Sequence, residues 1–267
     1  MTSPGPRSEV LAGRRPVLES LRAGHPAERV LIAREPGSSR LVAEIRRRAG
    51  ELSVPVRVVP RAVLDDLASG LNHQGVVAVT GPFRYAPLER ILHEPDPAVL
   101  FADGIMDPHN LGSLLRSAAG AGFAGLVVRA RRAAGVTATA RRVSAGAAET
   151  VPVARVGNLG LALDQARRAG LWIVGLDPDA AQDLWSSPLM EAPVGLVLGA
   201  EDRGLSPATR RHCDELVSIP TSGALGSLNV ASAGAVAMFE VARRREGSGA
   251  PPAGAKAAGS TLNPVLE

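Results

Sequence analysis

Two short apolar runs that each end in a glycine loop constrain the fold of this chain more than any other feature. The first run spans residues 194–198 and ends at the loop 199–204, and the second spans 216–220 and ends at the loop 221–227. Both runs have the length and composition of buried strands. Ligands of α/β proteins bind in crevices beyond the carboxyl ends of strands. The two loops therefore predict a ligand site between them.

The helix predicted after the second loop, Asn229 to Arg245, consists almost wholly of small residues in its first half. Residues 230–237 read VASAGAVA. Gly and Ala on all faces of a helix let neighbouring backbone approach closely. We therefore expect this helix to pack tightly within the surrounding chain.

Composition limits the class of protein. Hydrophobic residues make up 45% of the 267 residues but aromatic residues only 3%, so the core must be aliphatic. Cys213 is the only cysteine, which excludes an intrachain disulfide and a cysteine-based zinc site and suits a reducing cytoplasm. No apolar run reaches the roughly 20 residues of a membrane span. We expect a cytoplasmic protein with no membrane segment, and its net charge of +4 is compatible with a nucleic-acid partner.

Strands and helices alternate in two stretches of the chain, which predicts two α/β domains. Residues 8–82 are predicted to form a small module, and prolines cluster around a linker at 83–97. Residues 98–246 are predicted to form a second domain with a parallel, doubly wound sheet of five strands. The stretches 1–7 and 247–267 are expected to be disordered tails.

A polar loop and a helix follow the first strand of the second domain. Leu and Ala recur at helical spacing from Leu111 to Ala119 and mark a buried face, and Arg116 projects away from it, toward solvent or a ligand. Asn110 lies at the helix entry, where it either caps the helix or contacts a ligand. Residues 120–122, GAG, follow a helix, so they end it and do not form a dinucleotide-binding fingerprint. This argues against an ordinary Rossmann methyltransferase or dehydrogenase.

Three sequence blocks resemble, in their order, the SpoU family of ribose methyltransferases within the SPOUT superfamily. They are DGIMDPHNLG at 103–112 followed by Arg116, LVLGAEDRGL at 196–205, and SLNV at 227–230. Together the blocks are specific, and the resemblance covers nearly the whole chain.

A narrower resemblance is to the bacterial enzymes that methylate a guanosine ribose in 23S rRNA. It is carried by residues 13–19, 73–75 and 138–149. The N-terminal module of those enzymes binds RNA and is similar to certain ribosomal proteins. The chain departs from the family where Asp202 replaces a common glycine and Ala231-Ser232 replaces a Ser-Val order, which affects loop detail and substrate choice.

The resemblance implies a ribosomal-protein-like RNA-binding module at 8–82 and a methyltransferase domain at 98–246 with a deep trefoil knot, a feature almost absent from other proteins. It also implies a homodimer with the active site at or near the subunit interface. S-adenosylmethionine is the expected methyl donor, and no metal is expected. The expected partner is RNA, with a guanosine of 23S rRNA as the substrate.

The resemblance also assigns the site residues. By position, Gly199, Ile219 and Leu228 bind the cofactor, mostly through backbone groups, with Leu198, Pro220 and Val230 nearby. The catalytic residues are Arg116, Asn110, Glu201, Ser227 and Asn229. In the family the arginine that matches Arg116 is proposed to help activate the 2′-hydroxyl. Because arginine is essentially always protonated, we expect Arg116 to grip a phosphate and to stabilise the developing alkoxide.

The other four side chains take supporting roles in the same interpretation. Asn110 orients the ribose or Arg116, Glu201 holds the nucleotide or the arginine, and Ser227 and Asn229 complete the pocket by hydrogen bonds.

Two alternatives stay open. The same chemistry fits another rRNA site, including one of the antibiotic-resistance type, or a tRNA. A protein of another class, a non-catalytic RNA-binding or ribosome-assembly protein, predicts loss of Arg116, Glu201 or Asn229, and all three are present.

Overall fold

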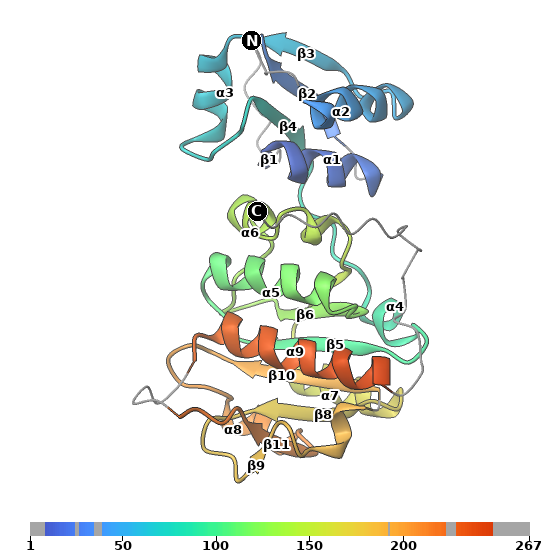
Figure 1. Ribbon diagram of the computed structural model, residues 1–267, viewed down its shortest axis with the longest axis vertical. Coiled ribbons are helices and arrows are strands. Elements are labelled where there is room, and N and C mark those ends of the chain that lie inside the picture. Colours follow the sequence, from blue (N-terminus) through green and yellow to red (C-terminus); the bar gives the residue numbers. More distant parts are fainter. Residues whose placement is uncertain (1–8, 25–26, 35–38, 192, 223–227, 248–267) are drawn as a thin grey trace, which may run out of the picture.

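The computed structural model describes residues 9–24, 27–34, 39–191, 193–222 and 228–247, which contain two β-sheets arranged along the long axis of the molecule (Figure 1). The N-terminal sheet has the order β1-β4-β2-β3. Its strands are β1 (Glu9–Ala12), β2 (Ala27–Ala33), β3 (Val56–Val59) and β4 (Val76–Thr80). Strand β4 is antiparallel to both β1 and β2, whereas β2 and β3 are parallel.

Helices cover both faces of this small sheet because side chains alternate along its strands. Helices α1 (Arg14–Arg22) and α2 (Arg40–Glu51) bury Leu18 and Ile45 against one face, together with Ile32 of β2. Helix α3 (Arg61–Ala68) buries Leu64 against the other face, together with Leu31.

The C-terminal sheet is wholly parallel and has seven strands in the order β7-β6-β5-β10-β8-β11-β9. Its strands are β5 (Ala98–Asp103), β6 (Gly125–Arg129), β7 (Val153–Val156), β8 (Trp172–Leu176), β9 (Gln182–Asp183), β10 (Val194–Gly199) and β11 (Glu215–Ser218). The predicted parallel sheet is confirmed. It has two more strands than the predicted five, and one of its seven strands, β9, could not be expected from the sequence because it is only two residues long and has no apolar run.

Helices pack on both faces of the parallel sheet. Helices α5 (Pro108–Gly120) and α9 (Val230–Gly247) cover one face, and α4 (Leu88–Leu92) and α7 (Leu159–Arg168) cover the other. The remaining helices are α6 (Ala138–Val143), α8 (Pro207–Arg211) and the 3-10 helices Ala147–Glu149 and Pro188–Met190. In the predicted linker 83–97, Ile91 of α4 is fully buried in the core of the second domain.

The C-terminal helix α9 packs closely because Gly234 faces both α5 and β10. A Cβ atom at Gly234 would lie 2.4 Å from Cδ2 of Leu114 and 2.7 Å from Cδ1 of Leu198. Residues 223–227, which join β11 to α9, lie outside the described residues, so the trefoil knot stays a prediction. The predicted tails also lie outside them, except for Gly247, which ends α9.

One buried arginine of α6 joins the two domains. Arg141 is only 3% exposed and donates from Nε to Glu149 Oε1 at 2.6 Å. Its Nη1 reaches the N-terminal sheet, where it donates to Glu9 Oε2 at 3.2 Å and to Thr80 Oγ1 at 3.1 Å. Removing one partner of a buried ion pair is costly. This network therefore holds the domains in one relative orientation.

The length and apolarity of the described helices can be compared with those of a membrane span. Among the described residues, α9 is the longest helix, and neither it nor any other helix there has the length and apolarity that a bilayer span requires.

Replacing Gly234 with a large side chain tests the tight packing of α9. We expect Gly234→Leu to lower the free energy of unfolding by about 1–3 kcal/mol, because the added atoms overlap Leu114 and Leu198. Ser232→Leu, at an exposed position of the same helix, is the matched control and should change stability little. Urea unfolding measures both variants, and equal stabilities would contradict the packing described.

Candidate active site

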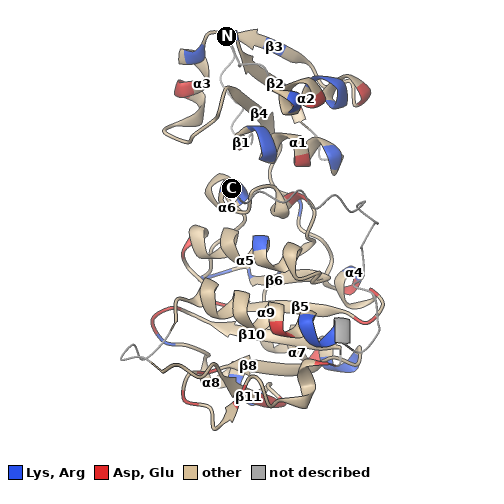
Figure 2. Ribbon diagram, in the orientation of Figure 1, with Lys and Arg blue, Asp and Glu red and all other residues tan. Residues whose placement is uncertain are grey.

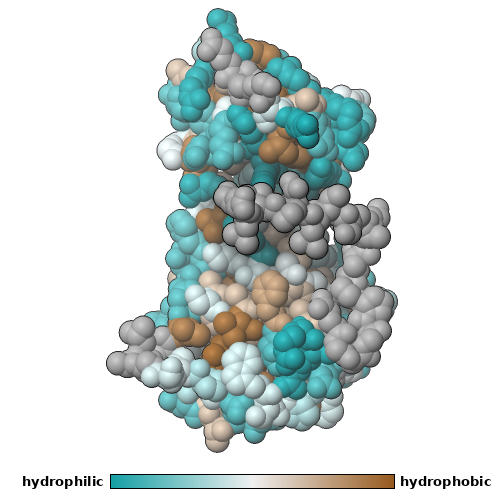
Figure 3. Space-filling view, in the orientation of Figure 1, coloured by the Kyte–Doolittle hydropathy of each residue, from teal (hydrophilic) through white to brown (hydrophobic). Residues whose placement is uncertain are grey.

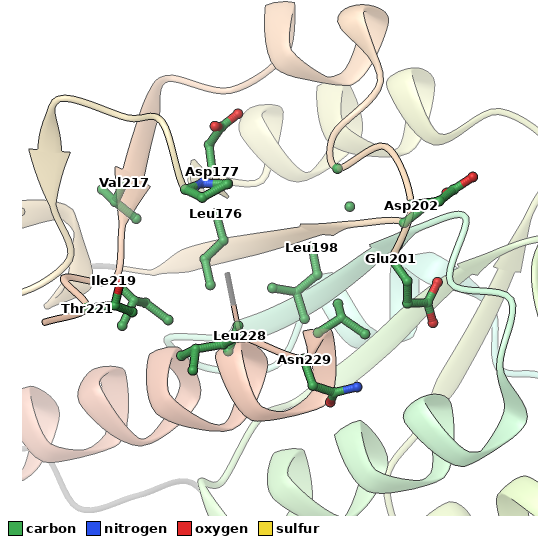
Figure 4. A pocket seen from close by; sticks show the side chains of 16 residues that line it. Leu176, Asp177, Leu198, Glu201, Asp202, Val217, Ile219, Thr221, Leu228 and Asn229 are labelled. Carbon is green, nitrogen blue, oxygen red and sulfur yellow. The ribbon is translucent and has the colours of Figure 1, made fainter. Parts of the chain in front are cut away.

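A cavity of about 480 Å³ opens at the carboxyl ends of β8, β10 and β11, beside the start of α9 (Figure 4). The predicted cofactor-binding residues that line it are Leu198, Gly199, Ile219, Leu228 and Val230. Pro220 is predicted as well but is not among the lining residues. The two glycine loops thus border one cavity, as expected for loops that follow parallel strands.

Three polar side chains from the three sequence blocks form a chain of hydrogen bonds next to this cavity. Asn229 Nδ2 donates to Asn110 Oδ1 at 3.2 Å, and Asn110 Nδ2 donates to Glu201 Oε1 at 2.8 Å. Glu201 and Asn229 line the cavity, and Figure 4 shows their side chains pointing toward the same side. Asn110 therefore couples the first glycine loop to the start of α9.

Helix capping explains why Asn110 is available for this role. Asp107 caps α5 instead, since its Oδ1 accepts a hydrogen bond from the backbone N–H of His109 at 2.8 Å. Asn229 caps α9, because its Oδ1 accepts from the N–H groups of Ala231 (2.9 Å) and Ser232 (3.3 Å). The structure therefore excludes the interpretation that Asn110 caps the N-terminus of α5.

The loop after β10 is closed by two backbone hydrogen bonds between Ala200 and Gly204, of 3.0 and 2.9 Å. A Cβ atom at Gly199 would lie 2.0 Å from the carbonyl carbon of Gly204, so only glycine fits there. Gly204 has φ +64°, a left-handed conformation that glycine adopts without strain. This tight turn holds Glu201 at the edge of the cavity.

Asp103, at the end of β5, anchors the far side of this loop. Its side chain is 2% exposed, and it accepts hydrogen bonds from Arg129 Nη1 (3.0 Å) and from the backbone N–H of Ser206 (3.0 Å). Burial alone would raise the pKa of Asp103, but hydrogen bonds from Thr209 and Ser206 and the charge of Arg129 lower it overall. The carboxylate is therefore ionised at neutral pH and fixes the segment that follows the loop.

Sequence reasoning missed the contribution of β8 to the cavity. Leu176 and Asp177, at its carboxyl end, line the cavity, and the buried Asp177 forms an ion pair with Arg210 of α8. The available signal was the polar residue Asp177, followed by a proline, directly after an apolar strand. Like the two glycine loops, Asp177 directly follows the carboxyl end of a parallel strand.

Two predicted catalytic residues are not brought to this cavity within the described chain. Arg116 is exposed on α5 and lines a different hollow, and its side chain makes no hydrogen bond or ion pair with the residues that the structure describes. Ser227 lies outside the described residues.

A metal site and the thiol of Cys213 would be two further kinds of reactive site among the described residues. Within the described ranges, no group of three or more His, Cys, Asp or Glu side chains is placed to hold a metal ion. Burial and the neighbouring charge of Asp214 raise the pKa of Cys213 to about 12, so its thiol is protonated at neutral pH and is a poor nucleophile.

Comparison with known proteins identifies the family of this chain. Residues 97–239 match the SpoU rRNA Methylase family. This chain belongs to the SpoU family. Residues 10–86 of this SpoU-family chain match a second family, described as RNA 2′-O ribose methyltransferase substrate binding. The chain is accordingly an RNA 2′-O-ribose methyltransferase.

Similar proteins span almost the whole SpoU-family chain. It is 42% identical to an uncharacterized tRNA/rRNA methyltransferase of Mycolicibacterium vanbaalenii over 89% of this chain and 77% of the relative. The crystal structure of the SpoU methyltransferase AviRb from Streptomyces viridochromogenes with AdoMet has a TM-score of 0.76 at 31% identity, covering 90% of this chain and 92% of AviRb. An AdoMet-bound rRNA methyltransferase from Sinorhizobium meliloti has a TM-score of 0.75 at 25% identity, covering 89% and 87%.

The depressed pKa of Asp103 predicts a pH-dependent effect of its substitution. A carboxyl whose pKa is lowered by folding stabilises the protein above its ordinary pKa of 3.8, and this contribution is lost as the pH falls through the lowered value. We expect Asp103→Asn to lower the free energy of unfolding by about 1–3 kcal/mol at pH 7. The deficit should stay constant down to about pH 5 and shrink below about pH 4.

Urea unfolding across this pH range measures the effect of Asp103→Asn. Asp202→Asn is the control, because Asp202 is an exposed carboxylate on the same loop. A deficit that does not change with pH would contradict an ionised, hydrogen-bonded Asp103.

Proposed function

We propose that this SpoU-family enzyme transfers a methyl group from S-adenosylmethionine to the ribose 2′-hydroxyl of a guanosine in 23S rRNA. The observation that carries the proposal is the hydrogen-bond chain from Asn229 through Asn110 to Glu201, which assembles three distant sequence blocks beside one cavity. Two similar proteins support it: the SpoU methyltransferase AviRb with bound AdoMet, and a protein from Sinorhizobium meliloti that is named an AdoMet-bound rRNA methyltransferase.

The cavity fits a donor with an apolar middle and polar ends. Leu198, Ile219, Leu228 and Val230 provide apolar surface, whereas Glu201, Asn229 and the buried Asp177 provide polar groups. Gly199, Ile219 and Leu228 would hold the donor through backbone groups, with Leu198, Pro220 and Val230 close by. When bound, the sulfonium supplies an electrophilic methyl group, and no metal is required.

The polar residues position the acceptor in this proposal. Asn110 is fixed by Asn229 and Glu201 and orients the ribose, and Ser227 adds a further hydrogen bond. Alignment of the hydroxyl with the methyl group contributes several kcal/mol in favourable cases, up to roughly 7–11. Arg116, protonated at neutral pH, binds the adjacent phosphate and stabilises the developing alkoxide.

Arg116 acts from a partner protomer in a homodimer, because it lies outside the cavity of its own chain. Figure 3 shows apolar side chains on the face over α5 and α9. Phe239 of α9 is 51% exposed there, and Leu228, just before α9, is 41% exposed. An exposed apolar patch of this kind is typical of an interaction surface and supports dimer formation through this face.

Residues 8–82 serve as the RNA-binding module and 98–246 as the methyltransferase domain of this proposed cytoplasmic enzyme, joined through 83–97. The trefoil knot of the family forms where α9 packs against the two glycine loops.

Substitution of Arg116 separates donor binding from methyl transfer. We expect Arg116→Ala to keep the affinity for S-adenosylmethionine and to lower kcat roughly 100- to 1,000-fold, because it removes charge stabilisation that operates only in the transition state. Calorimetry measures the donor affinity, and transfer of a labelled methyl group to RNA measures the rate. Arg168→Ala, at an exposed position on the opposite face of the sheet, is the matched control. A fully active Arg116→Ala enzyme would overturn this role.

The substrate is tested by mapping ribose methylation in RNA from a strain that lacks the gene. We expect one 23S rRNA guanosine to lose its 2′-O-methyl group and to regain it when the wild-type gene, but not the Arg116→Ala gene, is restored. Loss at another rRNA position or in a tRNA would correct the substrate. An unchanged methylation map together with normal ribosome assembly by the Arg116→Ala protein would favour a non-catalytic role.

A further inference from the structure

A second hollow, of about 430 Å³, lies between the N-terminal module and the methyltransferase domain. We propose that it binds the sugar–phosphate backbone of the RNA substrate, with Arg15 of α1 and Arg116 of α5 as the phosphate ligands on its two walls. The identity of the ligand as RNA rests on the proposed function, whereas the site itself rests on the two arginines that line the hollow.

The two walls of the hollow come from different domains. Arg15 and Leu18 of α1 and Leu41 of α2 form one wall, and Arg116 and Ala119 of α5 form the other, above the segment 144–147. Figure 2 shows basic positions on α1 and α5 on the two sides of the domain junction. A strand that passes from the RNA-binding module to the methyltransferase domain meets both arginines in this hollow.

Of the three arginines that line the hollow, only one has acidic partners among the described residues. Arg22 is neutralised by Glu19 and Glu44, each at 2.7 Å. Arg15 and Arg116 are both exposed, and their guanidinium groups have no hydrogen bond or ion pair within the described ranges of the chain. Two unpaired guanidinium groups that line one hollow favour an anion there, and a phosphodiester offers the oxygen acceptors that guanidinium groups prefer.

The lining favours contacts to the RNA backbone over contacts to bases. Apart from its charged residues, the hollow is lined by Leu, Ala, Gly, Ser and Thr, and no aromatic side chain is among the described residues that line it. Binding of unpaired bases normally uses stacking on aromatic side chains. Phosphate contacts position a nucleic acid without reading its sequence, so this site orients the strand and leaves base recognition to other parts of the enzyme.

The hollow is preformed in the protein without RNA. Arg141 ties α6 to Glu9 and Thr80 of the N-terminal sheet, close to the segment that forms the floor. At that floor a Cβ atom on Gly146 would lie 2.6 Å from Cγ of Glu19, which shows how closely the domains meet. A preformed site avoids the entropic cost of ordering two domains on binding.

Arg15→Ala tests this site in the full-length protein, with a labelled RNA hairpin as the probe. We expect the Kd measured by fluorescence anisotropy to rise roughly five- to tenfold and the slope of log K against log salt to fall by about 0.7–0.9, the loss of one phosphate contact. Arg15→Lys should keep the salt slope because it keeps the charge. In methyl transfer, KM for RNA should rise while kcat and the affinity for S-adenosylmethionine stay unchanged.

Arg168→Ala is the matched control, because Arg168 is an exposed arginine on α7, outside the RNA-binding module and on the face of the parallel sheet opposite α5. Equal Kd values and salt slopes for Arg15→Ala and Arg168→Ala would overturn the site, as would tighter binding of polyglutamate than of RNA. If the wild-type protein binds RNA through Arg15 but transfers no methyl group, the proposed function fails and the site stands. If it methylates RNA and Arg15→Ala behaves as Arg168→Ala does, the site fails and the proposed function stands.

Discussion

The side chain of Asn110 is the interaction on which the arrangement of the active site depends. An amide both accepts and donates, so one residue bonds to Asn229 and Glu201 at once. Hydrogen bonds to charged groups contribute roughly 1.5–3 kcal/mol and neutral ones about 1 kcal/mol. No other residue type of this size supplies both functions in a fixed plane. The first glycine loop and the start of α9 thus depend on a single side chain of α5.

Close packing around α5 makes this arrangement possible. Gly234 of α9 lies against one side of α5, and on another side a Cβ atom at Gly112 would lie 2.6 Å from the carbonyl oxygen of Ala140 in α6. Both neighbours therefore approach α5 more closely than larger residues allow. Asn110 and Arg116 are about 9 Å apart along the axis of this helix and about 240° apart around it. One rigid helix consequently serves both the cofactor cavity and the hollow between the domains.

Much of this site was predictable from sequence because it follows from strand order and loop composition. The apolar runs that end at Gly199 and Pro220 predicted a site beyond parallel strands, and the cavity lies there. The resemblance to the SpoU family named Asn110, Glu201 and Asn229, which the structure brings together. Roles of individual side chains within the site stay predictions.

Other features depend on contacts between distant segments, which a single sequence does not reveal. The choice of Asp107 over Asn110 as the cap of α5 depends on where Glu201 lies. Nothing in the sequence distinguishes Arg141 from a surface arginine, but in the structure it is buried because the N-terminal sheet covers it. The loop anchor Asp103 likewise looks like any polar residue at the end of a strand.

The central claim is that two glycine loops and the small-residue helix α9 enclose the methyl donor next to Asn110. A crystal structure of the protein with S-adenosylmethionine tests it most directly. We predict that the donor lies in the cavity against Gly199, Ile219 and Leu228, with the segment between β11 and α9 threaded to form the knot. A donor bound elsewhere on the protein, or an unthreaded chain at that position, would contradict the claim.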